Sequence, residues 1–379
     1  MRTARLIAKR VPQFDSGANQ ILRRKLPPQL SKQHVETFAL GQEVAYQITK
    51  RIQPEWSVAF LERRNRKFEA RSAIAVSRAK PSIIFGQYTA SFEPFRSAPS
   101  ECVRVLNYPI SHHEWLMDAM RSEGARNPRW ASILQGHDFS AETLARLNAE
   151  ISMADYIMVP STFAASTFEA AGINRSKLQI LPLGCDVQHD DADVTNPPAR
   201  STSLKVLYAG QVTQRKGIGY LAEAIASIPE ASLTVIGESS ARACALLERY
   251  PRVTMLASMP REQLLNNMRA ADVFVLPSLA EGFGLVALEA MSVGCPVLVS
   301  ANTFGSDLIE DGVNGFVLPS TDAADIAVQL KRIAAHPDIS KVRARAALTA
   351  KGYSWERYEK RIRDFSISVM ESKSVGRTS

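Results

Sequence analysis

The stretch that decides the fold is "SLAEGFGLVALEAMSVGCPVLVS", residues 278–300. It places Glu281 and Glu289 on either side of a Gly-Phe-Gly turn, which leads into an apolar helix and then an apolar strand. Glycines let the backbone approach a ligand closely, and the first amides of a helix have no partner within the helix. The turn therefore predicts an anion site at a helix start. Two carboxylates beside such a site require a specific explanation.

Short apolar runs surround this stretch and are typical of buried strands. They are "LKVLYAG" (204–210), "ASLTVIG" (231–237), "RVTML" (252–256), "DVFVLP" (272–277) and "CPVLVS" (295–300). Helical patterns lie between them, at 217–228 and 261–271. Strands that alternate with helices and are apolar throughout indicate a parallel sheet covered on both faces. We expect a Rossmann-like domain whose ligands lie beyond the carboxyl ends of the strands.

The first half of the chain shows the same alternation less clearly. Strands are expected at 81–86, 103–109 and 154–161, a helix at 140–152 and an amphipathic helix at 30–52. Residues 182–203 are polar and contain prolines, as in a linker. The predicted fold class is therefore α/β, with two Rossmann-like domains facing a cleft. We expect domains at 1–182 and 204–355, a linker at 183–203, and a C-terminal helix and tail at 356–379.

The composition limits the class of protein. The chain has 379 residues, 45% of them hydrophobic, which supports packed cores and argues against disorder. It has no apolar run of the length that spans a membrane, and the basic start "MRTARLIAKRVPQ" lacks a signal-peptide core. Its four scattered cysteines form no CxxC pair. We expect reduced thiols and a cytoplasmic location.

The net charge of +8 is concentrated near the start of the chain. Residues 1–100 contain 18 Lys and Arg against 7 Asp and Glu, so the remainder is slightly acidic. Such an excess is most often a solvated basic face. The alternative is peripheral contact with an anionic membrane surface or an acidic acceptor. No helix-turn-helix, RRM or zinc-finger pattern accompanies the charge, so nucleic acid is not an expected partner.

A ligand with hydroxyl groups on both sides of a diphosphate explains the two carboxylates. Glu289 lies about one turn into the helix, and helical side chains lean back toward the N-terminus. It can accept hydrogen bonds from a ribose diol, while Glu281 does the same for hydroxyls on the far side. These are the features of a nucleotide sugar. The alternative makes Glu281 a surface residue and Glu289 a helix-dipole partner.

A second motif, "YAGQVTQRKGIGYL" (208–221), places Arg215 and Lys216 before another helix start. Two cations there would neutralise a diphosphate as its charge develops, although a plain basic loop has the same pattern. We predict no essential metal. The "DAD" at 191–193 lies in the linker, and His137 with Asp138 lacks a third ligand at metal-like spacing.

Together these motifs closely resemble the donor site of family-four retaining glycosyltransferases, the glycosyl transferases group 1, which have the GT-B fold. The Glu-x7-Glu pattern is matched, with "ADVFVLPS" before it and "DLIEDGVNGFVLP" (307–319) after it, and the similarity extends over about 150–340. The resemblance implies that Glu289 binds ribose and Glu281 the transferred sugar. It also assigns the turn at Gly282, and the amides of Phe283, Gly284, Leu285 and Val286, to sugar and phosphates.

The same resemblance extends to the second motif and to the first domain. Lys216 matches the family's lysine, but Gln211, after Gly210, stands where the family usually has arginine, and Arg215 is expected to supply that charge. His112, in "NYPISHHEW", fits the histidine that contacts the donor sugar, although a structural histidine is the alternative. The expected catalytic residues are Glu281, Arg215, Lys216 and His112.

The implied function is a retaining, metal-independent hexosyltransferase. It would move a sugar from a nucleoside diphosphate donor to a hydroxyl acceptor, in polysaccharide or glycoconjugate synthesis, with no other cofactor. We expect a glycan or lipid-linked acceptor, bound by the 1–182 domain, and a location in the cytoplasm or at the inner membrane face. Residues 1–30 lack the family's opening strand and glycine-rich loop, which predicts a divergent or incomplete first domain. The alternatives are a catalytically silent nucleotide-sugar-binding relative and a sugar-nucleotide epimerase on the same fold.

Overall fold

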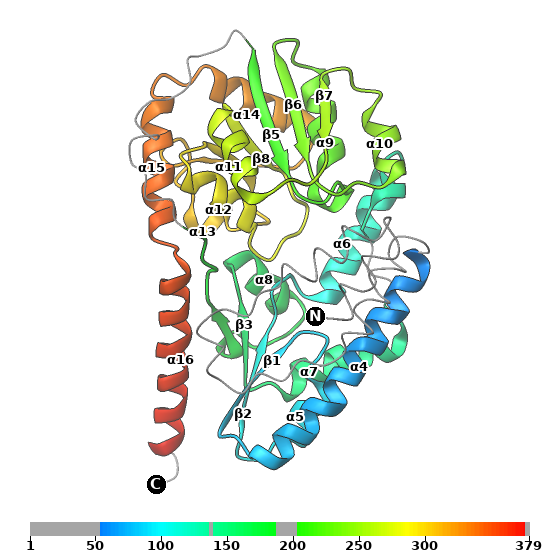
Figure 1. The fold of residues 1–379 in the computed structure, drawn as a ribbon, viewed down its shortest axis with the longest axis vertical. Helices are drawn as coiled ribbons and strands as arrows, with labels where there is room; N and C mark the ends of the chain where they lie inside the picture. Colours follow the sequence, from blue (N-terminus) through cyan, green and yellow to red (C-terminus); the bar gives the residue numbers. More distant parts are fainter. Residues whose placement is uncertain (1–53, 136–138, 187–202, 376–379) are drawn as a thin grey trace, which may run out of the picture. The chain divides into compact units, whose positions relative to one another are not determined.

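The structure is a computed structural model that describes residues 54–135, 139–186 and 203–375 (Figure 1). The features expected at 1–52, and most of the expected linker, lie outside these residues. Two sheets are present: one of four strands in the order β1-β2-β3-β4, and one of six in the order β10-β9-β8-β5-β6-β7. The described residues form two compact units, one within residues 1–106 and 141–155 and the other within residues 107–140 and 156–379. The expected domain boundaries stay a prediction.

The first unit contains a long helix, two strands and two further helices. They are α4 (Pro54–Ala79), β1 (Ile83–Gln87), α5 (Phe92–Ser97), β2 (Val103–Asn107, whose last residue begins the second unit) and α7 (Ala141–Met153). Helices α4 and α7 both pack against α5. Aromatic and aliphatic side chains of this unit, such as Phe95, Val105 and Leu147, are buried. A small core therefore joins the strands to the helices.

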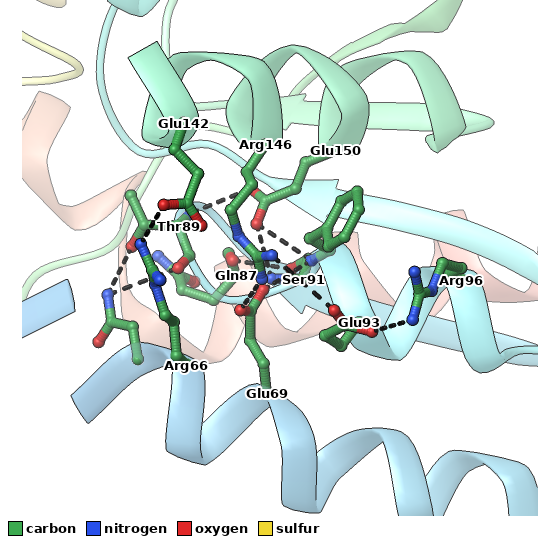
Figure 2. A network of polar contacts seen from close by, with 12 residues as sticks. Arg66, Glu69, Gln87, Thr89, Ser91, Glu93, Arg96, Glu142, Arg146 and Glu150 are labelled. Carbon is green, nitrogen blue, oxygen red and sulfur yellow. Dashed lines mark hydrogen bonds and ion pairs between the residues drawn. The ribbon is translucent and has the colours of Figure 1, made fainter. Parts of the chain in front are cut away.

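Buried carboxylates fix the turn that follows β1, as Figure 2 shows. Glu150 of α7 accepts hydrogen bonds from the backbone amides of Thr89 (3.0 Å), Ser91 (2.8 Å) and Phe92 (3.1 Å). Glu69 of α4 also accepts from the Phe92 amide, at 2.9 Å, and pairs with Arg146. Burial raises the pKa of Glu150 to about 7. Because the backbone donors of this turn are held from two helices, it is a rigid corner of the first unit.

The second unit begins with α6 (His113–Arg126), a 3-10 turn (Ala131–Ile133), β3 (Tyr156–Val159), α8 (Thr162–Ala170), another 3-10 turn (Arg175–Lys177) and β4 (Leu178–Ile180). The six-stranded part follows with β5 (Leu204–Ala209), the 3-10 turn Gln214–Lys216, α9 (Ile218–Ala226), β6 (Ala231–Ile236), α10 (Ala241–Leu247), β7 (Val253–Leu256), α11 (Arg261–Ala270), β8 (Val273–Leu276), α12 (Leu285–Ser292), β9 (Val297–Ser300), α13 (Gly305–Leu308) and β10 (Phe316–Leu318). It ends with α14 (Ala323–Ala334), α15 (Ile339–Lys351) and α16 (Trp355–Val375). Strand and helix alternate throughout the six-stranded part, as the sequence indicates.

The pairs of the six-stranded sheet are parallel, and its central strands are apolar on both faces. Every residue of β8 and of β9 is buried. Valine, leucine and phenylalanine occupy these positions because helices cover both sides of a parallel sheet. Strand β5 pairs with β6 on one side and with β8 on the other (Figure 1). The chain order reverses between β5 and β8, and ligands of doubly wound sheets bind at such a switch point.

The strands and helices expected in the second half are confirmed within one or two residues at most ends. The three strands and the helix expected in the first half are confirmed as β1, β2, β3 and α7. Helices α4 and α6 and the short strands β4 and β10 were not predicted from the sequence. Among the described residues, no helix is both long and apolar enough to cross a membrane.

Candidate functional site

The first loop at the switch point joins β5 to α9. Gly210 follows the strand with φ at 144°, and Gln211 is exposed. Gln214, Arg215 and Lys216 then form one 3-10 turn, which Gly217 ends in the left-handed conformation (φ 74°) before α9 begins. A Cβ at 217 would overlap the carbonyl oxygen of Pro277, at the end of β8. The absence of a side chain therefore lets the two switch-point loops pack against each other.

The second loop, after β8, brings Glu281 to the two cations. Glu281 is 8% exposed, and its carboxylate pairs with Lys216 through Oε1. The same oxygen lies 3.5 Å from Nη1 of Arg215 and 3.3 Å from Oγ of Ser278. Arg215 Nη1 also donates to the carbonyl of Ala280, at 2.7 Å. The two motifs singled out in the sequence thus meet in one charge cluster.

Burial governs the electrostatics of this cluster. Desolvation lowers the pKa of Lys216, while Glu281 raises it and Arg215 lowers it further. Removing one partner from such a cluster leaves a buried charge without its counter-ion, where little water is available to solvate it. Glu281, Arg215 and Lys216 consequently act as a unit, and a ligand that displaces one contact must replace it.

The turn between the two carboxylates is closely packed on its outer side. A Cβ at Gly282 would overlap the backbone of Pro109 and Ile110, and the Gly282 carbonyl accepts a hydrogen bond from Ser161 Oγ at 2.5 Å. Phe283 is buried against the ring of Phe304, with centroids 5.1 Å apart. These contacts fix the turn before the helix begins.

Helix α12 starts directly after the turn. Gly284 lies at its N-cap in the left-handed conformation (φ 96°), and no side chain caps the helix there. Leu285 and Val286 form its first turn, with no acidic residue. Gly284 has no side chain that could compete for the first amides, which keeps that helix end suited to an anion. The positions expected to meet sugar and phosphate are therefore together, although their role stays a prediction.

Glu289 lies on α12 and has a cation of its own. Its Oε1 accepts a hydrogen bond from Nε of Arg261, at 3.1 Å, and Arg261 also lies 3.6 Å from Asp186. The side chain of Glu289 is about one-fifth exposed. Both carboxylates that flank the helix start are thus paired with basic side chains. These pairs neutralise the negative charge that would otherwise repel an anion at the helix start.

His112 is buried at the start of α6. Its backbone amide donates to Thr167 Oγ1 at 2.9 Å, and its ring stacks on His113 and meets Phe168 edge-on. Within the described residues, its Nδ1 has no hydrogen-bond partner. Burial, with a smaller effect of His113, lowers the pKa of His112 to about 4. His112 is therefore neutral near pH 7. Among the described residues, it makes no hydrogen bond, ion pair or ring contact with Glu281, Arg215 or Lys216.

This depressed pKa predicts a pH dependence of stability. Below pH 6.5 the unfolded histidine takes up a proton, whereas the folded one stays neutral until about pH 4, so acid favours unfolding. When the pH falls from 7.5 to 5, protonation of His112 in the unfolded state should lower the unfolding free energy of wild type by about 2 kcal/mol. The His112→Gln variant should not show this additional loss. Urea unfolding of both proteins at each pH measures the difference. Parallel pH curves would contradict the buried, neutral state.

Three residues at the 3-10 turn Gln214–Lys216, here called the cation turn, were not predicted from the sequence: Gln135 and Glu123 contact the turn, and Gln214 belongs to it. Gln135 donates from Nε2 to Gln211 (3.0 Å) and accepts from Nε of Arg215 (3.1 Å). Glu123 of α6 accepts from Nε2 of Gln214, at 2.7 Å, and Gln214 accepts from the amide of Gly219 at 3.1 Å. Glu123, Gln214 and Gln135 carry no local signal, because each acts through a partner distant in sequence.

In the described residues, no group of three or more His, Cys, Asp and Glu side chains could hold a metal ion. The "DAD" at 191–193, and His137 with Asp138, lie outside those residues. The groups that form the candidate site are two carboxylates, two clustered cations, a glycine turn and an uncapped helix start. This set suits a ligand that carries both hydroxyl groups and phosphate.

Sequence comparisons point to one family. Residues 191–355 match the family model described as glycosyl transferases group 1. The D-inositol 3-phosphate glycosyltransferase of Mycolicibacterium smegmatis is 29% identical over 202 residues, which are 48% of this chain and 45% of that protein. That of Xylanimonas cellulosilytica is 25% identical over 313 residues, 63% of this chain and 75% of that protein. The match to the first of these relatives thus spans less than half of its length.

Solved structures show the same fold. A sucrose-phosphate synthase from Thermosynechococcus elongatus aligns with a TM-score of 0.65 and 22% identity, over 82% of this chain and 79% of that one. Anabaena HepE, solved with UDP and glucose, aligns with a TM-score of 0.59 and 19% identity, over 78% and 81%. The predicted α/β fold of GT-B type, with two Rossmann-like sheets, is confirmed. The similarity of this chain to the glycosyl transferases group 1 family is thus carried by residues 191–355.

Proposed function

We propose that the protein is a retaining glycosyltransferase that moves a hexose from a nucleoside diphosphate sugar to a hydroxyl acceptor, without a metal. The observation that carries this proposal is the cluster of Glu281 with Arg215 and Lys216 beside the uncapped start of α12. A carboxylate suits sugar hydroxyls, the cations suit a diphosphate, and the helix start favours negative charge.

In the proposed reaction the bond between the anomeric carbon and the diphosphate oxygen breaks. The acceptor oxygen bonds to that carbon on the same face, and the acceptor proton passes to the departing phosphate. Arg215 and Lys216 stabilise the charge that grows on the diphosphate, because they are already oriented and partly desolvated. Glu281 and the neutral His112 orient the sugar, and Glu289 orients the ribose through its diol.

A nucleotide-sugar donor and a hydroxyl acceptor fit what the similar proteins are named for or were solved with. Anabaena HepE was solved with UDP and glucose and, separately, with UDP-glucose, although its 19% and 18% identity supports the fold alone. The M. smegmatis relative is named for transfer to an inositol phosphate, a hydroxyl-bearing acceptor. For this chain we propose a glycan or lipid-linked acceptor in polysaccharide or glycoconjugate synthesis. Its basic first hundred residues suit peripheral contact with an anionic membrane at the cytoplasmic face.

A catalytically silent nucleotide-sugar-binding protein is the second candidate. The observation in its favour is Gln211, an amide at the position where the family usually has arginine. Against it stands the intact cluster of Arg215, Lys216 and Glu281, which binding alone does not require. An epimerase would need a different acid–base set, and the described site shows only the groups named above.

A donor screen tests the proposal. Wild type and Glu289→Gln, both with EDTA, are titrated calorimetrically with UDP-, GDP- and ADP-sugars, and each mixture is assayed for released nucleoside diphosphate and for epimerised sugar. We expect wild type to bind one donor at micromolar concentration and release its diphosphate slowly. Glu289→Gln should bind that donor about 10-fold more weakly, because an amide replaces a charged acceptor of the ribose diol.

The other outcomes separate the candidates. Binding without release, even when glycan acceptors are added, would favour the silent relative. A new sugar epimer would identify an epimerase. Unchanged donor affinity in Glu289→Gln, with the fold intact by circular dichroism, would remove Glu289 from the ribose role. A wild-type protein that binds none of the donors would overturn the proposed function.

A further inference from the structure

One segment of the chain lies against the cation turn without belonging to either donor motif. Residues 113–135, comprising α6 and the 3-10 turn after it, are here called the α6 segment. It lies in the second unit, although the chain on both sides of 107–140 belongs to the first. Trp130 of the segment is fully buried in the core of the six-stranded part, and its indole donates to Glu223 at 2.8 Å. The α6 segment is therefore firmly attached to the domain that holds the candidate site.

Two side chains of the α6 segment reach the turn that carries the cations. Glu123 is 5% exposed and accepts from Gln214, which is fully buried, through one oxygen, and from Tyr220 Oη through the other, at 2.9 Å. Gln214 in turn accepts from the Gly219 amide in the first turn of α9. Glu123 thus fixes the residue directly before Arg215, and the helix directly after Lys216.

Gln135 acts on the guanidinium itself. Its amide oxygen accepts from Nε of Arg215, and its amide nitrogen donates to Gln211. An amide has both a donor and an acceptor, so one side chain can join these two partners. Arg215 is then held along three directions: by Gln135, by the Ala280 carbonyl at 2.7 Å and by Glu281 at 3.5 Å.

We propose that Gln135 and Glu123 are positioning residues that hold Arg215 and Lys216 where the diphosphate charge develops. This inference rests on the proposed function and deepens it. A guanidinium with a fixed orientation stabilises a forming charge without first having to reorganise. Gln211, which stands where the family usually has arginine, accepts a hydrogen bond from Gln135 and so helps to hold it in place. Arg215 then supplies the positive charge that the missing arginine would have supplied. The contacts act on the transition state more than on the bound donor, so their loss should lower kcat more than it raises KM.

The test is a double-mutant cycle measured as diphosphate release from the donor that wild type uses. Gln135→Met keeps the length of the side chain and removes both hydrogen bonds. We expect kcat to fall by about 10- to 100-fold, with KM changed by less than about threefold. In an Arg215→Ala background the same substitution should change kcat by less than about twofold, because Gln135 then has no guanidinium to hold.

Two further variants keep the result interpretable. Ser132→Ala removes a hydrogen bond of the α6 segment to Arg242, at 3.1 Å, away from the cation turn, and should leave kcat unchanged. Glu123→Gln keeps the size of a buried side chain and should give a smaller loss of kcat than Gln135→Met. The inference would be overturned if the losses of kcat in Gln135→Met and Arg215→Ala added up in the double variant, or if Gln135→Met left kcat unchanged. In either case, turnover of the donor by wild type would still uphold the proposed function. Absence of donor turnover in wild type would overturn both.

Discussion

The Arg215→Ala, Lys216→Ala double variant should release nucleoside diphosphate at least about 10³-fold more slowly than wild type, while binding the free nucleoside nearly as well. The two cations share the Glu281 carboxylate in a buried cluster, so they are oriented before the donor arrives. Preoriented cations in a poorly hydrated site contribute most where charge is forming. Single-turnover rates and calorimetric titration with nucleoside and nucleoside diphosphate measure the two effects separately.

The control for this variant is Arg129→Ala. Arg129 is a half-exposed cation that lies over the Trp130 ring and contacts no residue of the cation turn among the described interactions. Its removal should leave turnover unchanged. Equal losses of affinity and turnover in the double variant would mean that the cations bind ground state and transition state alike, which would contradict their proposed role. Because Glu281 loses its partners, unfolding by urea must be followed alongside.

Gly282→Ala is the second substitution with a large expected effect. The new Cβ would overlap the backbone of Pro109 and Ile110, which cannot move aside as a flexible side chain could. The loop that contains Gly282 or the loop that contains Pro109 must therefore shift. Such a shift would also disturb the hydrogen bond from Ser161 Oγ to the Gly282 carbonyl. We expect a loss of about 2–4 kcal/mol in unfolding free energy, and weaker donor binding because Glu281 and the start of α12 move together.

Gly124→Ala is the matched control for this prediction. Gly124 lies inside α6, and its Cβ would meet only a Leu134 methyl group, at 3.4 Å. Alanine favours a helix over glycine by up to about 1 kcal/mol, so this variant should be as stable as wild type or more so. Urea unfolding and donor titration of both variants give the comparison. A Gly282→Ala protein with wild-type stability would show that the two loops are less tightly packed than described.

The sequence predicted the second half of the chain well because its signals are local. Each strand there is a run of β-branched or large apolar residues, and glycine or proline marks most of its ends. Glu281 and Glu289 stand out as candidate site residues because a fixed spacing around a glycine turn places both near one helix start. Arg215 and Lys216 stand out as candidates for the same reason, since they precede the start of another helix, α9.

The features that escaped prediction depend on tertiary contacts. Helix α4 is charged on most sides, so its 26 residues show little of the apolar periodicity that indicates a helix. The strand β4 has only three residues, Leu178–Ile180. Glu123 and Gln135 resemble ordinary surface residues of a helix and a loop, and only the fold brings them to Gln214 and Arg215, which lie 91 and 80 residues further along the chain. Arg261, the partner of Glu289, was missed for the same reason.

The uncapped start of α12 has a consequence for the lifetime of the protein. A helix that begins at a bare glycine forgoes roughly a few tenths of a kcal/mol that a capping side chain would supply, and about 0.3–1 kcal/mol that an acidic residue in its first turn would add. Under the proposed function the donor makes up this deficit, because a ligand that binds only the native state adds to stability in proportion to RT ln(1 + [L]/Kd). The supply of sugar nucleotide would then set heat tolerance and resistance to proteases as well as the rate of synthesis.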